Sequence, residues 1–348
     1  MTQTKETTSY DFEFISDDLS LCGTVEKPLR ITPRGSILLL SGSGPQDRDE
    51  SIAGQKPFCV LSHALANWGY VVFRWDDRGV GESDGDYLSA SAEHLVGDVI
   101  NAMSAIERET GFERHILIGH SQGTLIAAAV AAKLSSSVAG LVLLAGMGLP
   151  GREGLLDQHI RICQAEGWSD DDIQSSLAQK ETLFGILLDA QAEIDTEMPA
   201  ALAHQNLKAN LLGAFVGNLK ISDIPDDDRN DLESTIEDLL EWEWRYLLGV
   251  DPTADLLKVT CPVLAIVGDQ DSQVEAERNL SAIESACMRG HVPEVEVQVL
   301  ADHNHLFQKA TSAALSEYET LGKPFADDLL SIVRSWLSRN ELRMAKAD

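Results

Sequence analysis

Short apolar runs alternate with longer amphipathic stretches over the first part of the chain. The runs of strand length begin roughly 25 to 45 residues apart and cover residues 36–40, 70–75, 115–118 and 138–145. Helical patterns lie between them, notably over 92–110 and 123–134. Alternating strands and helices predict right-handed crossovers, hence an α/β fold with a mostly parallel sheet flanked by helices.

The pattern changes after Gly148-Leu149-Pro150-Gly151. From there to about residue 255 the apolar residues recur at helical spacing, and strand-like runs return only at 262–267 and 295–300. A helical block inside a strand–helix alternation predicts an inserted cap over the carboxyl ends of the strands, where such sheets carry their sites. We therefore expect a first core part over 1–148, a cap over 149–257 and a second core part over 258–348.

The charge of the chain narrows its possible partners. Its 348 residues include 56 acidic and 27 basic ones, a formal net charge of −29 at pH 7. This balance disfavours nucleic-acid phosphate and anionic membranes, so we expect neither as a partner. The segment 146–258 holds 23 acidic and 8 basic residues, a net of −15. A cap of that sign should disfavour anionic substrates.

The chain also shows no sign of export. Residues 1–10 are polar and lack the apolar core of a signal peptide, and no apolar run is long enough to span a bilayer. The cysteines are scattered, odd in number and never form C-x-x-C; they are Cys22, Cys59, Cys163, Cys261 and Cys287. That usage suits reduced thiols better than disulfides or a zinc site, so we expect a cytoplasmic protein.

The most specific motif is Gly119-His120-Ser121-Gln122-Gly123, which stands between the strand-like run 115–118 and an alanine-rich helical stretch. G-x-S-x-G in that context is typical of a nucleophile elbow. The turn is so sharp that the residues two before and two after the serine must be small. We therefore predict that Ser121 is a nucleophile. The backbone N–H of Gln122, at the start of the helix, is one expected oxyanion donor.

A serine nucleophile needs a histidine base and an orienting carboxylate, which in such folds follow in the order Ser, acid, His. The acid is expected just after the run 262–267. Asp271 is preferred to Asp269 there, because the turn after Gly268 must first be completed. The alternative interpretation is that one or both carboxylates only cap the helix that follows.

The base is expected after the last strand-like run, where two histidines compete. His305 is preferred to His303 because it lies further into the loop and precedes the apolar pair Leu306-Phe307, which can anchor it. The H-x-H spacing would also suit a metal pair. No third ligand is evident, however, so we expect no metal.

A second oxyanion donor is expected in the glycine-rich loop after residues 36–40, which reads Ser41-Gly42-Ser43-Gly44-Pro45-Gln46-Asp47-Arg48-Asp49. Glycines let such a backbone approach a substrate closely. The N–H of Ser43 is the first choice and that of Gly44 the next. The loop does not match a P-loop, because no Gly-Lys-Ser/Thr follows. Nothing in the sequence suggests a cofactor.

Taken together, these segments resemble an α/β-hydrolase, and more narrowly the bacterial serine esterases and serine aminopeptidase-like proteins. The likeness lies in residues 42–49, the turn Asp76-Asp77-Arg78-Gly79-Val80-Gly81-Glu82-Ser83, the elbow and Asn304-His305-Leu306-Phe307-Gln308. It covers nearly the whole chain except the cap. The resemblance implies Ser121 as nucleophile, Asp271 as acid and His305 as base, with Asp77 and Arg78 bracing nearby loops. One departure is Ser41, where many relatives carry histidine.

The predicted activity is hydrolysis of a small-molecule carboxylic ester through a serine acyl-enzyme, without a cofactor. One alternative is a peptidase or amidase with the same machinery, since cap carboxylates would suit substrates with a free amino terminus. Another is a small-molecule-binding protein that kept the fold and lost turnover.

Overall fold

The computed structural model describes residues 6–194, 200–216 and 226–344. The chain folds into two compact units. One comprises Met1–Leu149 and Asp251–Asp348, and the other comprises Pro150–Val250.

The first unit is built on an eight-stranded sheet with the order β1-β2-β4-β3-β5-β6-β7-β8. The strands are β1 (Thr7–Ser16), β2 (Leu19–Pro28), β3 (Ser36–Leu40), β4 (Val71–Trp75), β5 (His115–His120), β6 (Val138–Leu144), β7 (Val263–Gly268) and β8 (Val295–Leu300). β1 and β2 form an antiparallel hairpin at one edge, and β2 is antiparallel to β4. From β4 to β8 all neighbours are parallel, which confirms the predicted α/β fold.

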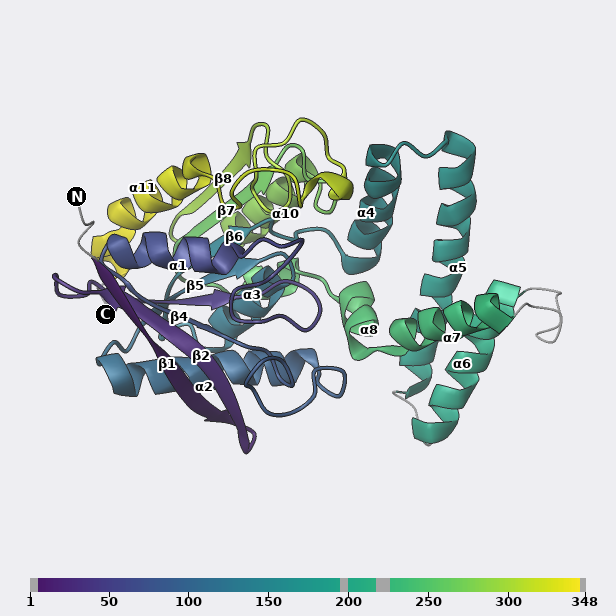
Figure 1. Ribbon diagram of the computed structural model, residues 1–348, viewed down its shortest axis with the longest axis horizontal. Helices are drawn as coiled ribbons and strands as arrows, with labels where there is room; N and C mark the ends of the chain where they lie inside the picture. Colours follow the sequence, from purple (N-terminus) through teal and green to yellow (C-terminus); the bar gives the residue numbers. More distant parts are fainter. Residues whose placement is uncertain (1–5, 195–199, 217–225, 345–348) are drawn as a thin grey trace. The chain divides into compact units, whose positions relative to one another are not determined.

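Helices cover both faces of this sheet (Figure 1). On one face lie α1 (Pro57–Asn67) and α11 (Asp327–Met344), which pack together over a core that includes Phe58, Leu65 and Trp336. The helices that contact the other face are α2 (Ala92–Thr110), α3 (Gly123–Lys133) and α10 (Ala276–Arg289). Because the central strands are buried on both sides, they appear in the sequence as continuous apolar runs.

Local chemistry sets the ends of α2. The side-chain oxygen of Ser91 accepts a hydrogen bond from the N–H of His94 at 3.3 Å, a typical N-cap. The helix ends at Gly111, whose φ of 76° is left-handed and therefore suited to glycine.

The second unit is helical throughout its described residues. Its helices are α4 (Gly151–Ala165), α5 (Asp170–Ile194), α6 (Ala200–Val216), α7 (Asp226–Leu240) and α8 (Trp242–Gly249). Their small apolar core includes Cys163, Ile173 and Phe184, and Phe184 packs against Trp244 with ring centroids 6.1 Å apart. The helical block expected over 149–257 corresponds to this unit, whereas the short α9 (Thr253–Leu256) belongs to the sheet-containing unit. Among the described helices, none combines the length and apolarity needed to cross a membrane.

A buried histidine at the start of β5 predicts how stability depends on pH. His115 is only 1% exposed, and its Nδ1 lies 2.7 Å from the hydroxyl of Ser36 on β3. Burial lowers the pKa of His115 from 6.5 to about 4. Protonation therefore favours the unfolded chain, and the stabilisation is present above pH 6.5 and lost as the pH falls towards 4.

We expect this group to remove about 3 kcal/mol of unfolding free energy between pH 7 and pH 4. Urea unfolding of the parent and of His115→Asn at both pH values measures it, because the other titrating groups cancel between the two proteins. The parent should lose more stability on acidification than the variant. Equal losses would show that His115 is not held neutral by burial.

Candidate active site

The predicted nucleophile lies in a strained turn between β5 and α3. Ser121 has a φ of 52°, in the left-handed region that residues with a side chain rarely adopt. Its backbone N–H donates to the carbonyl of Leu144 on β6 at 2.9 Å, which fixes the turn against the sheet. A Cβ on Gly119 would lie 2.3 Å from the carbonyl oxygen of Gly123, and one on Gly123 would lie 2.2 Å from that of Leu40. Both flanking positions therefore require glycine, as the elbow motif demands.

The structure brings Asp271 and His305 together. Asp271 follows β7, His305 follows β8, and Asp271 Oδ2 lies 2.8 Å from His305 Nδ1. The carboxylate can only accept, so Nδ1 carries the proton and Nε2 is left as the basic nitrogen. Both residues are buried, with 2% and 4% of their surface exposed. A low-dielectric setting of this kind strengthens the pair.

The other oxygen of Asp271 fixes the carboxylate. Oδ1 accepts the backbone N–H groups of Gln273 and Val274 at 2.7 and 2.9 Å. The helix that follows, α10, is capped by the side chain of Glu275, so the alternative that Asp271 only caps this helix is wrong. The Asp271 carboxylate instead holds the turn after β7 and binds His305.

The two competing residues are engaged elsewhere. Asp269 is exposed and accepts the N–H of Asp302 at 2.7 Å. The ring of His303 is fully buried, and its Nδ1 donates to the carbonyl of Ala301 at 2.6 Å. Its Nε2 has no partner among the described residues. Neither residue contacts the Asp271–His305 pair through a hydrogen bond that the structure describes.

The loop that carries His305 is anchored from both sides. Leu306 and Phe307 are both 0% exposed. Asn304 supports them from within the loop, because its side-chain oxygen accepts the N–H groups of Leu306 and Gln308 at 3.1 and 2.9 Å. Gln308 is itself held by the carbonyl of Gly322 at 2.9 Å. The histidine ring is thus presented by a rigid backbone.

The elbow lies beside this loop. The rings of His120 and His305 have centroids 4.8 Å apart, and His120 Nε2 lies 2.9 Å from the carbonyl oxygen of His305. His120 is the last residue of β5, and Ser121 follows it directly. Ser121, Asp271 and His305 therefore emerge at the carboxyl edge of the sheet, from β5, β7 and the end of β8.

The glycine-rich loop after β3 reaches the same place. A Cβ on Gly42 would lie 3.3 Å from the Cβ of Ser121, so this backbone runs directly past Ser121. The N–H of Gly42 is already bound, because it donates to Glu50 Oε1 at 2.7 Å. The next residue is Ser43, the expected oxyanion donor. Gln122, the other expected donor, is 1% exposed at the start of α3.

Residues 76–83 brace the loops around the site. Asp77 accepts the hydroxyl of Ser41 at 3.3 Å and the N–H of Gln46 at 2.9 Å. Arg78 binds both oxygens of Asp98 at 2.7 Å. Asp77 therefore braces the glycine-rich loop, as the family resemblance implies, whereas Arg78 is bound to helix α2 through Asp98 and to the β1–β2 turn through Asp17.

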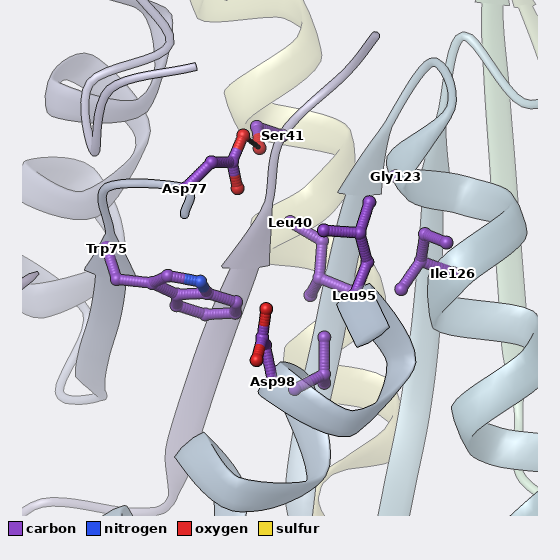
Figure 2. A pocket seen from close by; sticks show the side chains of 9 residues that line it. Leu40, Ser41, Trp75, Asp77, Leu95, Asp98, Gly123 and Ile126 are labelled. Carbon is purple, nitrogen blue, oxygen red and sulfur yellow. Dashed lines mark hydrogen bonds between the residues drawn. The ribbon is translucent and has the colours of Figure 1, made fainter. Parts of the chain in front are cut away.

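A small pocket lies beside the elbow, between the ends of β3 and β4 and the helices α2 and α3. Its volume is about 30 Å³, and its lining includes Leu40, Ser41, Trp75, Asp77 and Gly123. Figure 2 shows Ser41 and Asp77 pointing toward each other at its polar end. A space of this size holds about one or two water molecules.

The sequence pattern does not single out Glu50, although the structure places it at the site. Its side chain is 0% exposed and contacts both the glycine-rich loop after β3, through Gly42, and the elbow, through His120. No local signal distinguishes it from Asp47 and Asp49 in the same acidic loop. Its left-handed φ of 52° and its burial are visible only in the folded structure.

Sequence comparison finds similarity to a hydrolase family, to an esterase and to an acyltransferase. The Hydrolase_4 family, described as "Serine aminopeptidase, S33", matches residues 56–217. Esterase EstD of Thermotoga maritima is 27% identical over 138 residues, which cover 40% of this chain and 33% of EstD. Human 1-acylglycerol-3-phosphate O-acyltransferase ABHD5 is 31% identical over 150 residues, 39% of this chain and 41% of that protein. The chain thus spans less than half the length of either relative.

Structural comparison covers almost the whole chain. The Pyrococcus furiosus esterase Pf2001 matches with a TM-score of 0.56 at 14% identity, over 95% of this chain and 91% of that one. The proline iminopeptidase of Mycobacterium smegmatis matches with a TM-score of 0.52 at 16% identity, over 96% and 99%. At such identities the likeness shows the fold alone.

Proposed function

We propose that this chain, which belongs to the α/β-hydrolase superfamily, is a serine hydrolase that cleaves carboxylic esters through an acyl-enzyme on Ser121. The observation that carries the proposal is the buried 2.8 Å contact between Asp271 and His305, beside the strained turn that bears Ser121. The similarity to esterase EstD agrees with this reaction class.

In the proposed reaction, the oxygen of Ser121 attacks the ester carbonyl carbon while its proton passes to His305 Nε2. Asp271 stabilises the imidazolium through Nδ1. The N–H groups of Gln122 and Ser43 bind the oxyanion of the tetrahedral intermediate. Collapse breaks the bond to the alcohol, which leaves with the proton from His305. A water molecule, deprotonated by His305, then cleaves the acyl-enzyme and restores Ser121.

Ester and amide hydrolysis use the same machinery, so substrate panels decide between them. We expect the purified protein to hydrolyse p-nitrophenyl esters with a higher kcat/KM than aminoacyl p-nitroanilides. The reverse order would favour the aminopeptidase alternative, in keeping with the description of the matching family. Turnover of neither class would favour a binding protein that kept only the fold.

We also propose that the helical unit Pro150–Val250 serves as the cap. Because the segment 146–258 carries a net charge of −15, we expect neutral esters to be preferred over esters with a carboxylate near the scissile bond. Added salt should narrow the difference by screening these charges. Values of kcat/KM for matched neutral and anionic esters, at low and high ionic strength, measure both effects.

Preference for the anionic ester would contradict the expected effect of the acidic segment. A cation would then have to bind the substrate carboxylate, and Lys180 is a candidate. The ammonium of Lys180 lies 5.7 Å from the ring centroids of both Phe184 and Trp244 within the helical unit. Burial lowers the pKa of this amine. If Lys180 binds the substrate carboxylate, Lys180→Ala should abolish the preference.

A further inference from the structure

We infer that Glu50 and His120 form a positioning pair that holds the oxyanion loop and the His305 loop in place around Ser121. The inference rests on the proposed function and concerns residues that do not take part in the bond-making steps. It assigns a task to the histidine of the elbow motif and to a buried carboxylate.

The pair is the centre of a continuous chain of hydrogen bonds. Glu50 Oε1 accepts the N–H of Gly42 at 2.7 Å and lies 2.9 Å from Nδ1 of His120. Nε2 of His120 lies 2.9 Å from the carbonyl oxygen of His305. The loop after β3, the elbow and the loop after β8 are thereby tied together, although Glu50 and His305 are far apart in the sequence.

Both partners of the His120 ring are acceptors, which fixes its protonation. A carbonyl oxygen cannot donate, so Nε2 carries a proton, and a carboxylate at Nδ1 requires a second one. Burial by itself would lower the pKa of His120, but Glu50, the His305 carbonyl and the more distant Asp271 raise it above its ordinary value. A charged ring makes both hydrogen bonds at once, and these are stronger than neutral ones.

The arrangement is poorly explained by stability alone. Glu50 is 0% and His120 1% exposed, and removing two charges from water offsets most of their attraction. Glu50 Oε2 is buried without a partner among the described residues, which adds a further cost. Apolar side chains of similar volume would fill this space at least as favourably. Apolar side chains could not, however, form the hydrogen bonds that hold the N–H of Gly42 and the carbonyl of His305 in place.

These two hydrogen bonds position groups that act in the transition state of the proposed reaction. With the N–H of Gly42 bound to Glu50, the following peptide is oriented beside Ser121, and this peptide carries the N–H of Ser43. With its carbonyl bound to His120, His305 is held with its ring 4.8 Å from the His120 ring while Asp271 binds its Nδ1. Loss of the pair should therefore lower kcat and leave KM nearly unchanged.

The test is Glu50→Gln, which keeps the shape but removes the charge that holds the His120 ring doubly protonated. With the remaining ring proton on Nε2, Nδ1 of His120 is an acceptor that faces the amide oxygen, so the hydrogen bond between the two side chains is lost while the N–H of Gly42 keeps its acceptor. We expect kcat per active site to fall about 10- to 100-fold, with KM within about 2-fold, because a misplacement near 1 Å has an effect of this size. Active sites are counted by end-point labelling with a fluorophosphonate, so molecules that fail to fold do not enter the rate.

Glu26→Gln is the matched control. Glu26 is also a buried carboxylate in the same unit, 2.9 Å from Nδ1 of His63 and 2.8 Å from the Ser62 hydroxyl, but it lies on β2, away from the elbow. We expect its kcat per active site to match the parent. A second variant, His120→Asn, can still donate to Glu50 but cannot reach the His305 carbonyl. It should show the same loss in kcat at unchanged KM, and the double variant should lose no more than the worse single one.

The inference is overturned if Glu50→Gln and His120→Asn keep the parent kcat per active site, or lose no more than Glu26→Gln. It is also overturned if the losses are additive or appear in KM. Failure of the proposed function has a different signature, because the parent protein itself would then show neither ester turnover nor labelling.

Discussion

Replacing Ser121 with alanine should lower kcat for ester hydrolysis by about 10⁴- to 10⁶-fold, the loss that follows removal of a serine nucleophile from such a triad. The fold should persist, because the contact that fixes the turn is the backbone N–H of Ser121 to Leu144, which alanine retains. Steady-state kinetics with a p-nitrophenyl ester measures the loss, and urea unfolding checks the fold.

One outcome would contradict the assignment. Near-parental turnover in Ser121→Ala would place the nucleophile elsewhere. A large loss accompanied by unfolding would say nothing of chemistry, and Ser121→Cys then separates the two cases. A cysteine keeps a nucleophile at the same atom position, so a folded protein labelled there by a thiol-reactive ester analogue is expected.

The second large effect concerns the two histidines after β8. His305→Ala should approach the level of Ser121→Ala, because it removes the base and leaves the Asp271 carboxylate buried without its partner. His303→Ala should keep kcat per active site within about 10-fold of the parent, because among the described residues the His303 ring is hydrogen-bonded only to the Ala301 carbonyl. Rates are again divided by the number of fluorophosphonate-labelled sites, since His303 is fully buried and its loss leaves a cavity.

If the two variants exchange these behaviours, the base is His303, and the contact between Asp271 and His305 is structural. Equal, moderate losses in both would indicate that neither ring takes the proton from Ser121.

The sheet was predictable because its central strands are buried on both faces. The apolar runs expected at 36–40 and 295–300 coincide with β3 and β8, and the run at 262–267 lies within one residue of β7. The elbow was equally predictable, since its glycines are demanded by sterics within a few residues. Gly123 would collide with Leu40 if it carried a Cβ, and the motif records that constraint directly.

The surroundings of the elbow depend on contacts that no local pattern encodes. His120 is separated from its partners Glu50 and His305 by 70 and 185 residues, so no local pattern predicts that its ring joins them. Glu50 lies among other acids of an acidic loop, and only its tertiary burial distinguishes it. The sequence likewise left open whether Ser43 or Gly44 supplies the second oxyanion donor, and the hydrogen bond from Gly42 to Glu50 that orients this loop has no local signal.

The central claim is that Ser121 is a nucleophile activated by His305 and Asp271. Peptide mass spectrometry after treatment with a fluorophosphonate tests it most directly, because the adduct marks the attacking atom. The account predicts a single adduct on the peptide that contains Ser121, formed far more slowly in His305→Ala and absent from Ser121→Ala. An adduct on any other residue, or one that persists in Ser121→Ala, would contradict it.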